Sequence, residues 1–184
     1  MIIGPLDRGI RKVRVWQNEM PYTIAPGEIL RTSISPTGTP SIDYEISVAV
    51  EMSLFASPRL QYGLLGANYK PEKSGDLLIS VFVSESLENP FTESIAWKRD
   101  RVFWGLLKEY ALAVLKIVTS SPVAIGPGTL DFRCAAHAEI GSNQVLFACL
   151  AQTLMSTFAD GLNGEEIADV AFRQSIKESG VLLA

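Results

Sequence analysis

Cysteine and histidine are scarce in this sequence, which contains two cysteines and one histidine among 184 residues. Zinc sites are built mainly from these residue types, so the scarcity argues against a metal site, and we expect no cofactor. The cysteines, Cys134 and Cys149, each lie inside an apolar segment, which favours reduced core residues over a disulfide bridge. We expect both thiols to be free and unreactive, and we expect the protein to reside in the cytoplasm.

Long hydrophobic runs and an excess of basic residues are absent as well. No run of about 18 apolar residues occurs, and the N-terminus lacks the apolar region of a signal peptide, so neither a membrane span nor a secretion signal is expected. The net charge is −4 and the pI is about 5.1, which argues against binding to a nucleic-acid backbone. We therefore expect a protein partner, and neither membrane nor nucleic acid; the partner's identity and the oligomeric state stay open.

The apolar content is that of an ordinary globular protein. Apolar residues make up 47% of the chain, which argues against disorder. A chain of this length buries roughly 70% of its unfolded surface on folding and needs no disulfide to stabilise it. Because there is no internal repeat and no low-complexity segment, residues 1–184 are predicted to form a single α+β domain.

The strongest pattern, over residues 129–158, combines a strand, a turn and a helix. Alternation predicts the strand, and one face is expected to carry Leu130, Phe132, Cys134, Ala136, Ala138 and Ile140. The other face is expected to carry Asp131, Arg133, His137 and Glu139. After the turn, the period changes to that of a helix, whose buried stripe contains Phe147, Leu150 and Leu154. We expect this helix to pack against the sheet core.

Further elements follow from the same two periods. Strands are predicted at 10–16, 41–56, 59–66 and 76–85, and helices at 101–118 and 165–178. The stretch at 18–40 is rich in proline and glycine and is expected to be mostly loop, with an extended piece at 28–33. Asp100 is placed to cap the first of these helices. Strands cluster early in the chain and helices late, which favours a two-layer α+β sandwich over a doubly wound parallel sheet. We expect a mainly antiparallel sheet of four to six strands with two or three helices packed on one face.

A family resemblance covers residues 77–158. Its features are the strand LLISVFVSE, the helix FWGLLKEYALAVL, the strand DFRCAAHAEI and the apolar helix in GSNQVLFACLA. In these features the segment resembles domain IV of elongation factor G, whose fold is shared with the second domain of ribosomal protein S5. The resemblance implies this fold for the segment. The chain has no P-loop, which excludes the whole GTPase factor, and a shared fold carries little information about function.

The single histidine provides the candidate catalytic chemistry. His137 is expected to share a strand face with Asp131, Arg133 and Glu139, an arrangement suited to an acid–base pair or a pair of ligands. The alternative interpretation is a solvated sheet face on which Arg133 forms a salt bridge. Cys134 lies three residues from His137, so the two side chains point to opposite faces and cannot form a thiol–imidazole pair.

Two rows of like charge are candidate binding surfaces. An acidic row on the polar parity of the strand at 41–56 would attract a basic partner, and it consists of Asp43, Glu45 and Glu51. A basic row near the N-terminus is a candidate site for RNA or phosphate, and it consists of Arg8, Arg11, Lys12 and Arg14. Both rows can equally be ordinary solvated strand faces, and the basic row has no aromatic neighbour except Trp16.

The sequence leaves three classes of function open. The first is a non-enzymatic protein-binding module, such as an immunity- or antitoxin-type inhibitor or a regulatory protein, acting on a basic macromolecular partner. The second is a small enzyme that uses His137 with Glu139 or Asp131 as acid and base. The third is a ribosome- or RNA-associated protein. The surroundings of His137 discriminate between them, because an enzyme needs a pocket with a carboxylate within hydrogen-bond reach, whereas a binder presents an open surface.

Overall fold

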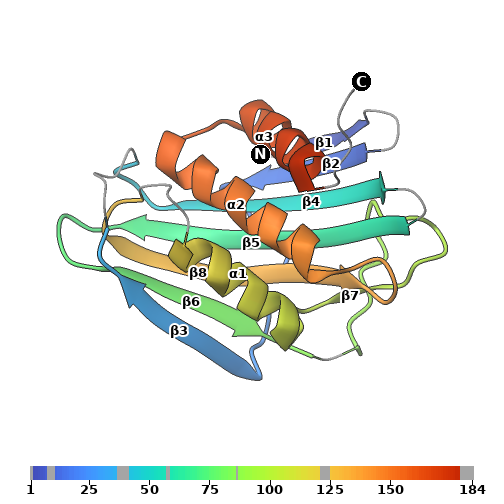
Figure 1. The fold of residues 1–184 in the computed structure, drawn as a ribbon, viewed down its shortest axis with the longest axis horizontal. Helices are drawn as coiled ribbons and strands as arrows, with labels where there is room; N and C mark the ends of the chain where they lie inside the picture. Colours follow the sequence, from blue (N-terminus) through green and yellow to red (C-terminus); the bar gives the residue numbers. More distant parts are fainter. Residues whose placement is uncertain are drawn as a thin grey trace.

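The computed structural model describes residues 2–7, 11–36, 42–56, 59–85, 87–120 and 125–178. Its elements are β1 (Ile2–Asp7), β2 (Arg11–Gln17), β3 (Glu28–Ile34), β4 (Ile46–Ala56), β5 (Arg59–Pro71), β6 (Leu77–Val83), β7 (Val102–Trp104), α1 (Lys108–Ser120), β8 (Gly128–Ala138), α2 (Gln144–Asp160) and α3 (Gly164–Glu178). The strands form one sheet, and the three helices of the described residues lie on one of its faces (Figure 1). The α+β class is therefore confirmed.

The strands follow the order β1-β2-β4-β5-β8-β6-β3 across the sheet, and β7 pairs with the C-terminal end of β8. Neighbouring strands are antiparallel except for β6 and β8, which are parallel. Parallel strands need a long crossover connection, and α1 lies in the chain between these two. The sheet is mainly antiparallel as expected, with more strands than the four to six predicted.

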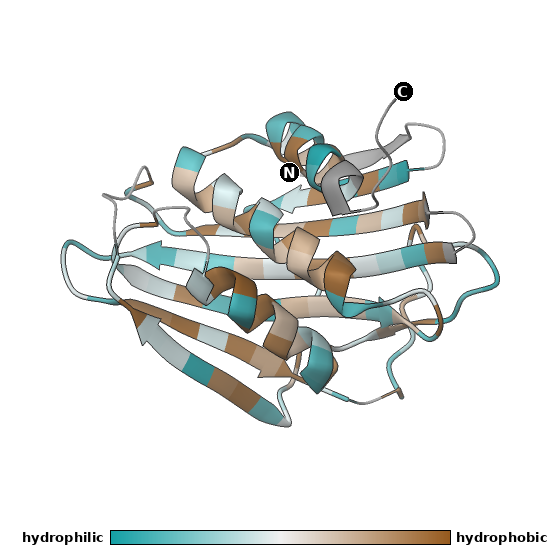
Figure 2. Ribbon diagram, viewed as in Figure 1, coloured by the Kyte–Doolittle hydropathy of each residue, from teal (hydrophilic) through white to brown (hydrophobic). Residues whose placement is uncertain are grey.

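The helix-covered face holds the main apolar core. α1 lies over β6 and β3, α2 over β5 and β4, and α3 over β2. Figure 2 shows apolar residues along α2 and along β4. Phe147, Leu150 and Leu154 of α2 are fully buried, which confirms the predicted stripe. Gly63 lies where α2 crosses β5. A Cβ atom there would lie 3.1 Å from Cδ1 of Leu150, so glycine permits the close approach of helix and strand.

The helix predicted at 101–118 is wrong over its first turns. Residues 102–104 form β7, and α1 begins only at Lys108. The two elements are separated by Gly105, whose φ of 140° lies outside the region that helices use. The Asp100 carboxylate caps no helix, and it accepts hydrogen bonds from the backbone N–H groups of Ile140 and Gly141. A short apolar run fits either period, and pairing with β8 makes this one a strand.

The alternation predicted for residues 130–140 is interrupted within β8. A β-bulge opposite Gly66 and Ala67 shifts the register at Arg133, so that Phe132 and Ala135 both face the helices. Cys134, Ala136 and Ala138 consequently face the opposite side, in a second apolar cluster. The prediction that one face carries all the alternate residues is therefore wrong beyond Phe132. It is also wrong for Ile140, which lies past the end of β8 with 85% of its surface exposed.

The second cluster is covered by connecting segments instead of helices. It contains Trp16, Ala49, Tyr62, Leu64, Phe91, Val102, Cys134, Ala136 and Ala138. Both cysteines are free and buried, as predicted, and burial raises the pKa of the Cys134 thiol to about 12. That thiol is protonated at neutral pH, which is the state with little nucleophilic reactivity. Among the described residues, no helix combines the length and the hydropathy needed to cross a membrane.

Candidate functional site

The predicted acidic row does not form one exposed surface. Asp43 and Glu45 are exposed and precede β4, which begins at Ile46, and Glu45 accepts a hydrogen bond of 2.9 Å from the Asn68 side-chain amide. Glu51, in contrast, is completely buried. A connecting segment covers the Glu51 side chain, because the helices lie on the other face of the sheet. A surface of three free carboxylates on β4 is therefore ruled out by the fold.

The buried Glu51 carboxylate is the centre of a polar network on the loop-covered face. Its Oε2 atom lies 3.3 Å from Nε of Arg14, the residue directly opposite on β2. Its Oε1 atom accepts hydrogen bonds from the Tyr62 hydroxyl, at 2.7 Å, and from the Ile95 backbone N–H, at 2.9 Å. The network joins β2, β4 and β5 to the segment that crosses above them.

Burial governs the titration of this network. It raises the pKa of the Glu51 carboxyl, although the hydrogen bond from Ile95 and the Arg14 charge both act in the opposite direction. Burial and the adjacent carboxylate together raise the pKa of Tyr62 as well. Tyr62 therefore stays a hydrogen-bond donor to Glu51 at neutral pH.

The segment above the network, residues 89–104, is a loop with paired arms. The Phe91 N–H donates to the Val102 carbonyl and the Trp104 N–H to the Asn89 carbonyl, each at 2.8 Å. Trp104 is stacked between the rings of Tyr22 and Phe91, with centroid distances of 4.8 and 4.0 Å. These contacts fix both arms to the sheet. The tip of the loop, between the arms, therefore lies across the loop-covered face of the sheet.

The same network fixes the tip. The Arg14 guanidinium donates to the Glu93 carbonyl at 3.0 Å, in addition to its pairing with the carboxylate of Glu51. At the far end of the tip, the Asp100 N–H donates to the Trp97 carbonyl at 2.9 Å, closing a turn. The Asp100 carboxylate in turn holds the backbone after β8. The position of the turn at 97–100 is therefore determined at both of its ends.

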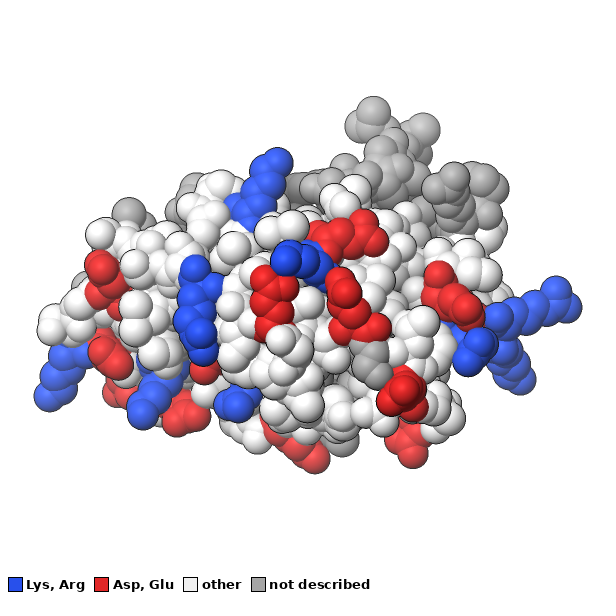
Figure 3. Space-filling model, turned by 90° about the horizontal axis from the view of Figure 1, so that it is seen from below, with Lys and Arg blue, Asp and Glu red and all other residues white. Residues whose placement is uncertain are grey.

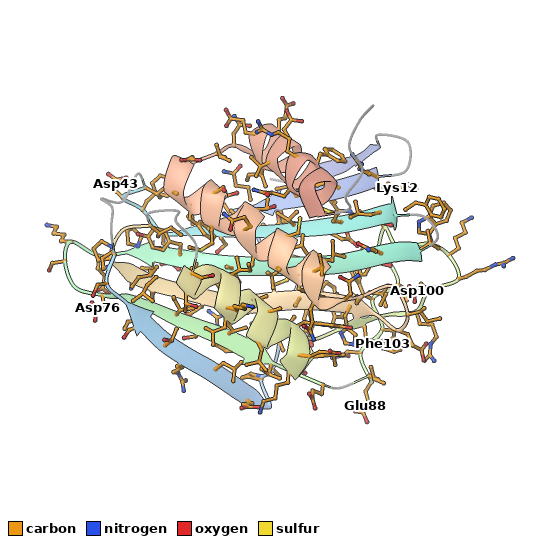
Figure 4. The ribbon with its side chains drawn as sticks, viewed as in Figure 1. Lys12, Asp43, Asp76, Glu88, Asp100 and Phe103 are labelled. Carbon is orange, nitrogen blue, oxygen red and sulfur yellow. The ribbon has the colours of Figure 1, made fainter. Side chains whose placement is uncertain are left out.

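This turn forms one wall of a hollow of about 350 Å³, the Trp97 pocket, which is lined by Lys12, Leu60, Ile95, Ala96, Trp97, Lys98 and Arg99. Trp97 keeps 49% of its surface exposed. Figure 4 labels Lys12 and Asp100 at one end of the sheet and Asp43 and Asp76 at the other. Figure 3 shows basic side chains projecting furthest at that first end. An exposed tryptophan and several cations therefore lie close together there.

The cations of the Trp97 pocket are uncompensated within the described part of the chain. Lys12, Lys98 and Arg99 are exposed, and no ion pair joins any of them to a described carboxylate. The floor below them is apolar, with Leu60, Ile95 and Ala96. An apolar centre surrounded by charged groups is the composition of a protein-binding surface, and Trp and Arg are the residues most often dominant in binding energy.

The structure places the candidate catalytic residues apart. After the bulge, His137 faces the helices with 2% of its surface exposed, and its Nδ1 lies 3.1 Å from the Gly105 carbonyl oxygen. Asp131 stays on the opposite face. The Glu139 carboxylate lies 3.6 Å from the guanidinium of Arg101. The expectation that His137 shares a face with Asp131 and Arg133 is wrong, because the bulge at Arg133 reverses the alternation before His137.

The imidazole of His137 is buried inside the protein. It lies between the rings of Phe103 and Tyr110, each with a centroid 6.3 Å away. Its Nε2 atom is buried and has no hydrogen-bond partner among the described residues. Burial lowers the pKa of His137, and the hydrogen bond to Gly105 opposes this only in part. The ring is therefore neutral at neutral pH and is buried from solvent.

The predicted basic row is divided by the fold. Arg8 lies outside the described residues. Arg11 shares the parity of Val13, which faces the helices, whereas Lys12 and Arg14 are on the loop-covered face. Sequence reasoning missed the contribution of residues 97–99, since that segment reads as a plain connection. The available signal was a tryptophan followed by two basic residues, WKR, inside a polar stretch.

The described residues contain no group of three or more His, Cys, Asp or Glu side chains arranged to hold a metal ion. The chain matches no family model, no curated protein and no solved structure. The resemblance of residues 77–158 to domain IV of elongation factor G therefore stays a prediction.

Proposed function

We propose that the protein is a non-enzymatic binding module that takes an acidic segment of another protein into the Trp97 pocket. The observation that carries this proposal is the half-exposed Trp97 among three uncompensated cations, on a turn that is anchored at both ends. A rigid tryptophan on a fixed backbone loses little conformational entropy on binding. The proposed role is still that of an inhibitor or regulator, as expected from the sequence. The partner, however, is proposed to be acidic, whereas the sequence predicted a basic one.

The composition of the Trp97 pocket favours a peptide over an oligonucleotide. Nucleic-acid interfaces are large and strongly basic, whereas this pocket combines a few cations with an apolar floor in a chain of net charge −4. The ligand that matches it has carboxylates for the rim and one aromatic or large aliphatic side chain for the floor beside Trp97. Screened charge attraction would raise the association rate of such a ligand.

A selection from a phage-displayed library of random dodecapeptides tests the proposal. The immobilised full chain should enrich peptides with several acidic residues and at least one aromatic or large aliphatic residue. Titration with an enriched synthetic peptide should change the fluorescence of the wild-type protein and leave that of Trp97→Phe almost unchanged, because Trp97 is the tryptophan in the pocket. Trp97→Ala should weaken binding by about tenfold or more.

Charge reversal supplies the matched control. Lys98→Glu combined with Arg99→Glu should abolish most of the binding, and added salt should weaken wild-type binding. Lys73→Glu reverses a charge on the exposed turn between β5 and β6, away from the pocket, and should leave the affinity unchanged. Enriched peptides without acidic residues, or equal binding by the charge-reversed variant, would refute the proposal. Tighter binding of a single-stranded oligonucleotide, lost in the same variants, would favour the ribosome- or RNA-associated alternative.

A further inference from the structure

A second surface, on the helix side of the molecule, consists of the groove between α1 and α2, which lie side by side in Figure 1. The groove is lined by Glu109, Leu112, Ala113, Lys116, Ile117, Gln144, Val145 and Ala148. Leu112 and Val145 each have 50% of their surface exposed. This apolar surface therefore stays exposed after the helices have packed on the sheet.

The charges beside the groove have a self-complementary arrangement. Glu109 and Lys116 lie three residues before and four residues after Leu112, so all three share one face of α1. If a second copy of α1 crosses antiparallel, with the two-fold axis between positions 112 and 113, Glu109 of each copy faces Lys116 of the other. One contact surface then forms two ion pairs, which is the property of an isologous interface.

The shape of the groove fits the same arrangement. The two-fold axis places Leu112 of one copy against Ala113 of the other, a large side chain opposite a small one. Ala148 of α2 widens the space around this position. A protruding leucine that enters a gap left by alanines is the packing by which antiparallel helices approach closely.

We infer that the α1–α2 groove is the contact surface of a homodimer, in which two copies of α1 pair antiparallel about Leu112 and Ala113. This dimer is independent of the Trp97 pocket, which lies on the opposite face of the sheet. A core of one helix pair is small beside a standard interface of about 1,600 Å², so the association is expected in the micromolar range.

Sedimentation velocity of the full chain, from about 1 to about 300 μM, measures the association. The wild-type protein should shift from monomer to dimer over this range. Leu112→Glu should remain a monomer with an unchanged far-ultraviolet circular dichroism spectrum. Leu78→Glu, which alters an equally exposed leucine on β6, should leave the dimer unchanged.

Exchange of the charges tests the antiparallel geometry. Glu109→Lys alone places like charges opposite each other and should weaken the dimer by about tenfold or more. Combining it with Lys116→Glu restores both ion pairs and should restore the wild-type affinity. These two positions are exposed, so the test does not depend on Leu112→Glu folding. A wild-type protein that stays monomeric at the highest concentration, or a charge-exchanged variant that remains as weak as Glu109→Lys, would overturn the inference.

Discussion

The two faces of the sheet are buried by different means. Under the helices, the core consists of apolar side chains, and α2 contributes Phe147, Leu150 and Leu154 to it. Under residues 89–104, the sheet carries the fully buried carboxylate of Glu51, whose partner Arg14 is partly buried. Apolar burial is non-directional and tolerates small shifts, whereas a buried ion pair requires its partners in defined positions.

This difference matches the binding role proposed for the loop-covered face. A buried ion pair is weak evidence for stability, because desolvation offsets much of the attraction between the charges. Glu51 also accepts a hydrogen bond from the backbone of Ile95, and Arg14 donates one to the carbonyl of Glu93. The pair therefore positions the tip of the loop, and with it Trp97. The helix-covered face holds the larger apolar core, whereas the loop-covered face, beside its smaller apolar cluster, fixes the geometry of the Trp97 pocket.

The largest effect is expected from Arg14→Met, which leaves Glu51 charged and buried without a cation. Breaking a buried ion pair on one side costs about 3–5 kcal/mol of the free energy of unfolding. The double variant Arg14→Met with Glu51→Gln removes the charge and keeps an acceptor for Ile95 and Tyr62, so it should recover more than half of the loss. Urea denaturation of the wild type, the single variant and the double variant gives these energies.

The pH dependence of the free energy of unfolding of Arg14→Met provides the control for this prediction. Because the folded pKa of Glu51 is raised, protonation is favoured in the folded state, and the penalty should shrink as the pH falls toward 4.5, the ordinary value. A single variant as stable as the wild type would show that the network does not hold the loop.

On the helix-covered face, Leu150→Ala should cost about 2–5 kcal/mol of the free energy of unfolding, because it opens a cavity where α2 meets Gly63. The matched control, Leu78→Ala, truncates a half-exposed leucine on β6 and should change that free energy by no more than about 0.5 kcal/mol. Both values come from the same denaturation series. A loss below about 1 kcal/mol for Leu150→Ala would mean that α2 does not pack tightly on β5.

The smallest effect concerns His137, and it appears as a dependence of stability on pH. Its folded pKa lies below the ordinary value of 6.5, so the unfolded chain binds the proton more readily. The stabilisation is complete above pH 6.5 and is lost as the pH falls from there toward the folded pKa. Thermal melts at pH 7.5 and 5.5 should show a smaller difference for His137→Gln than for the wild type. Equal differences in both proteins would place the imidazole in contact with water.

Much of the fold could be read from local patterns. The period of apolar residues identified β4, β6 and α2 and the buried side of α2, because each element reports its own faces through its side-chain repeat. The same reasoning failed at 102–104 and at the β8 bulge. In both places the outcome depends on a strand pair far away in the sequence, and a local repeat carries no information about it.

The candidate site was predictable only in part. Lys12 and Arg14 were selected for their charge, and their different roles follow from the register of β2 and β4, which places Arg14 opposite Glu51 and Lys12 opposite Ser53. Alternation of charged residues along one strand cannot show which of them a distant loop will cover. Residues 97–99 were not predicted as site residues, because only the folded chain brings them close to Lys12.

The sequence by itself determined the α+β class, most of the element types and the buried stripe of α2, since these depend on residues near one another in the chain. Only the tertiary structure decided that Glu51 is buried, that His137 is turned away from Asp131, and that Lys12 lies beside Trp97. The physical reason is that the environment of a charged side chain is set by groups from several strands and a loop, which only the folded chain brings together.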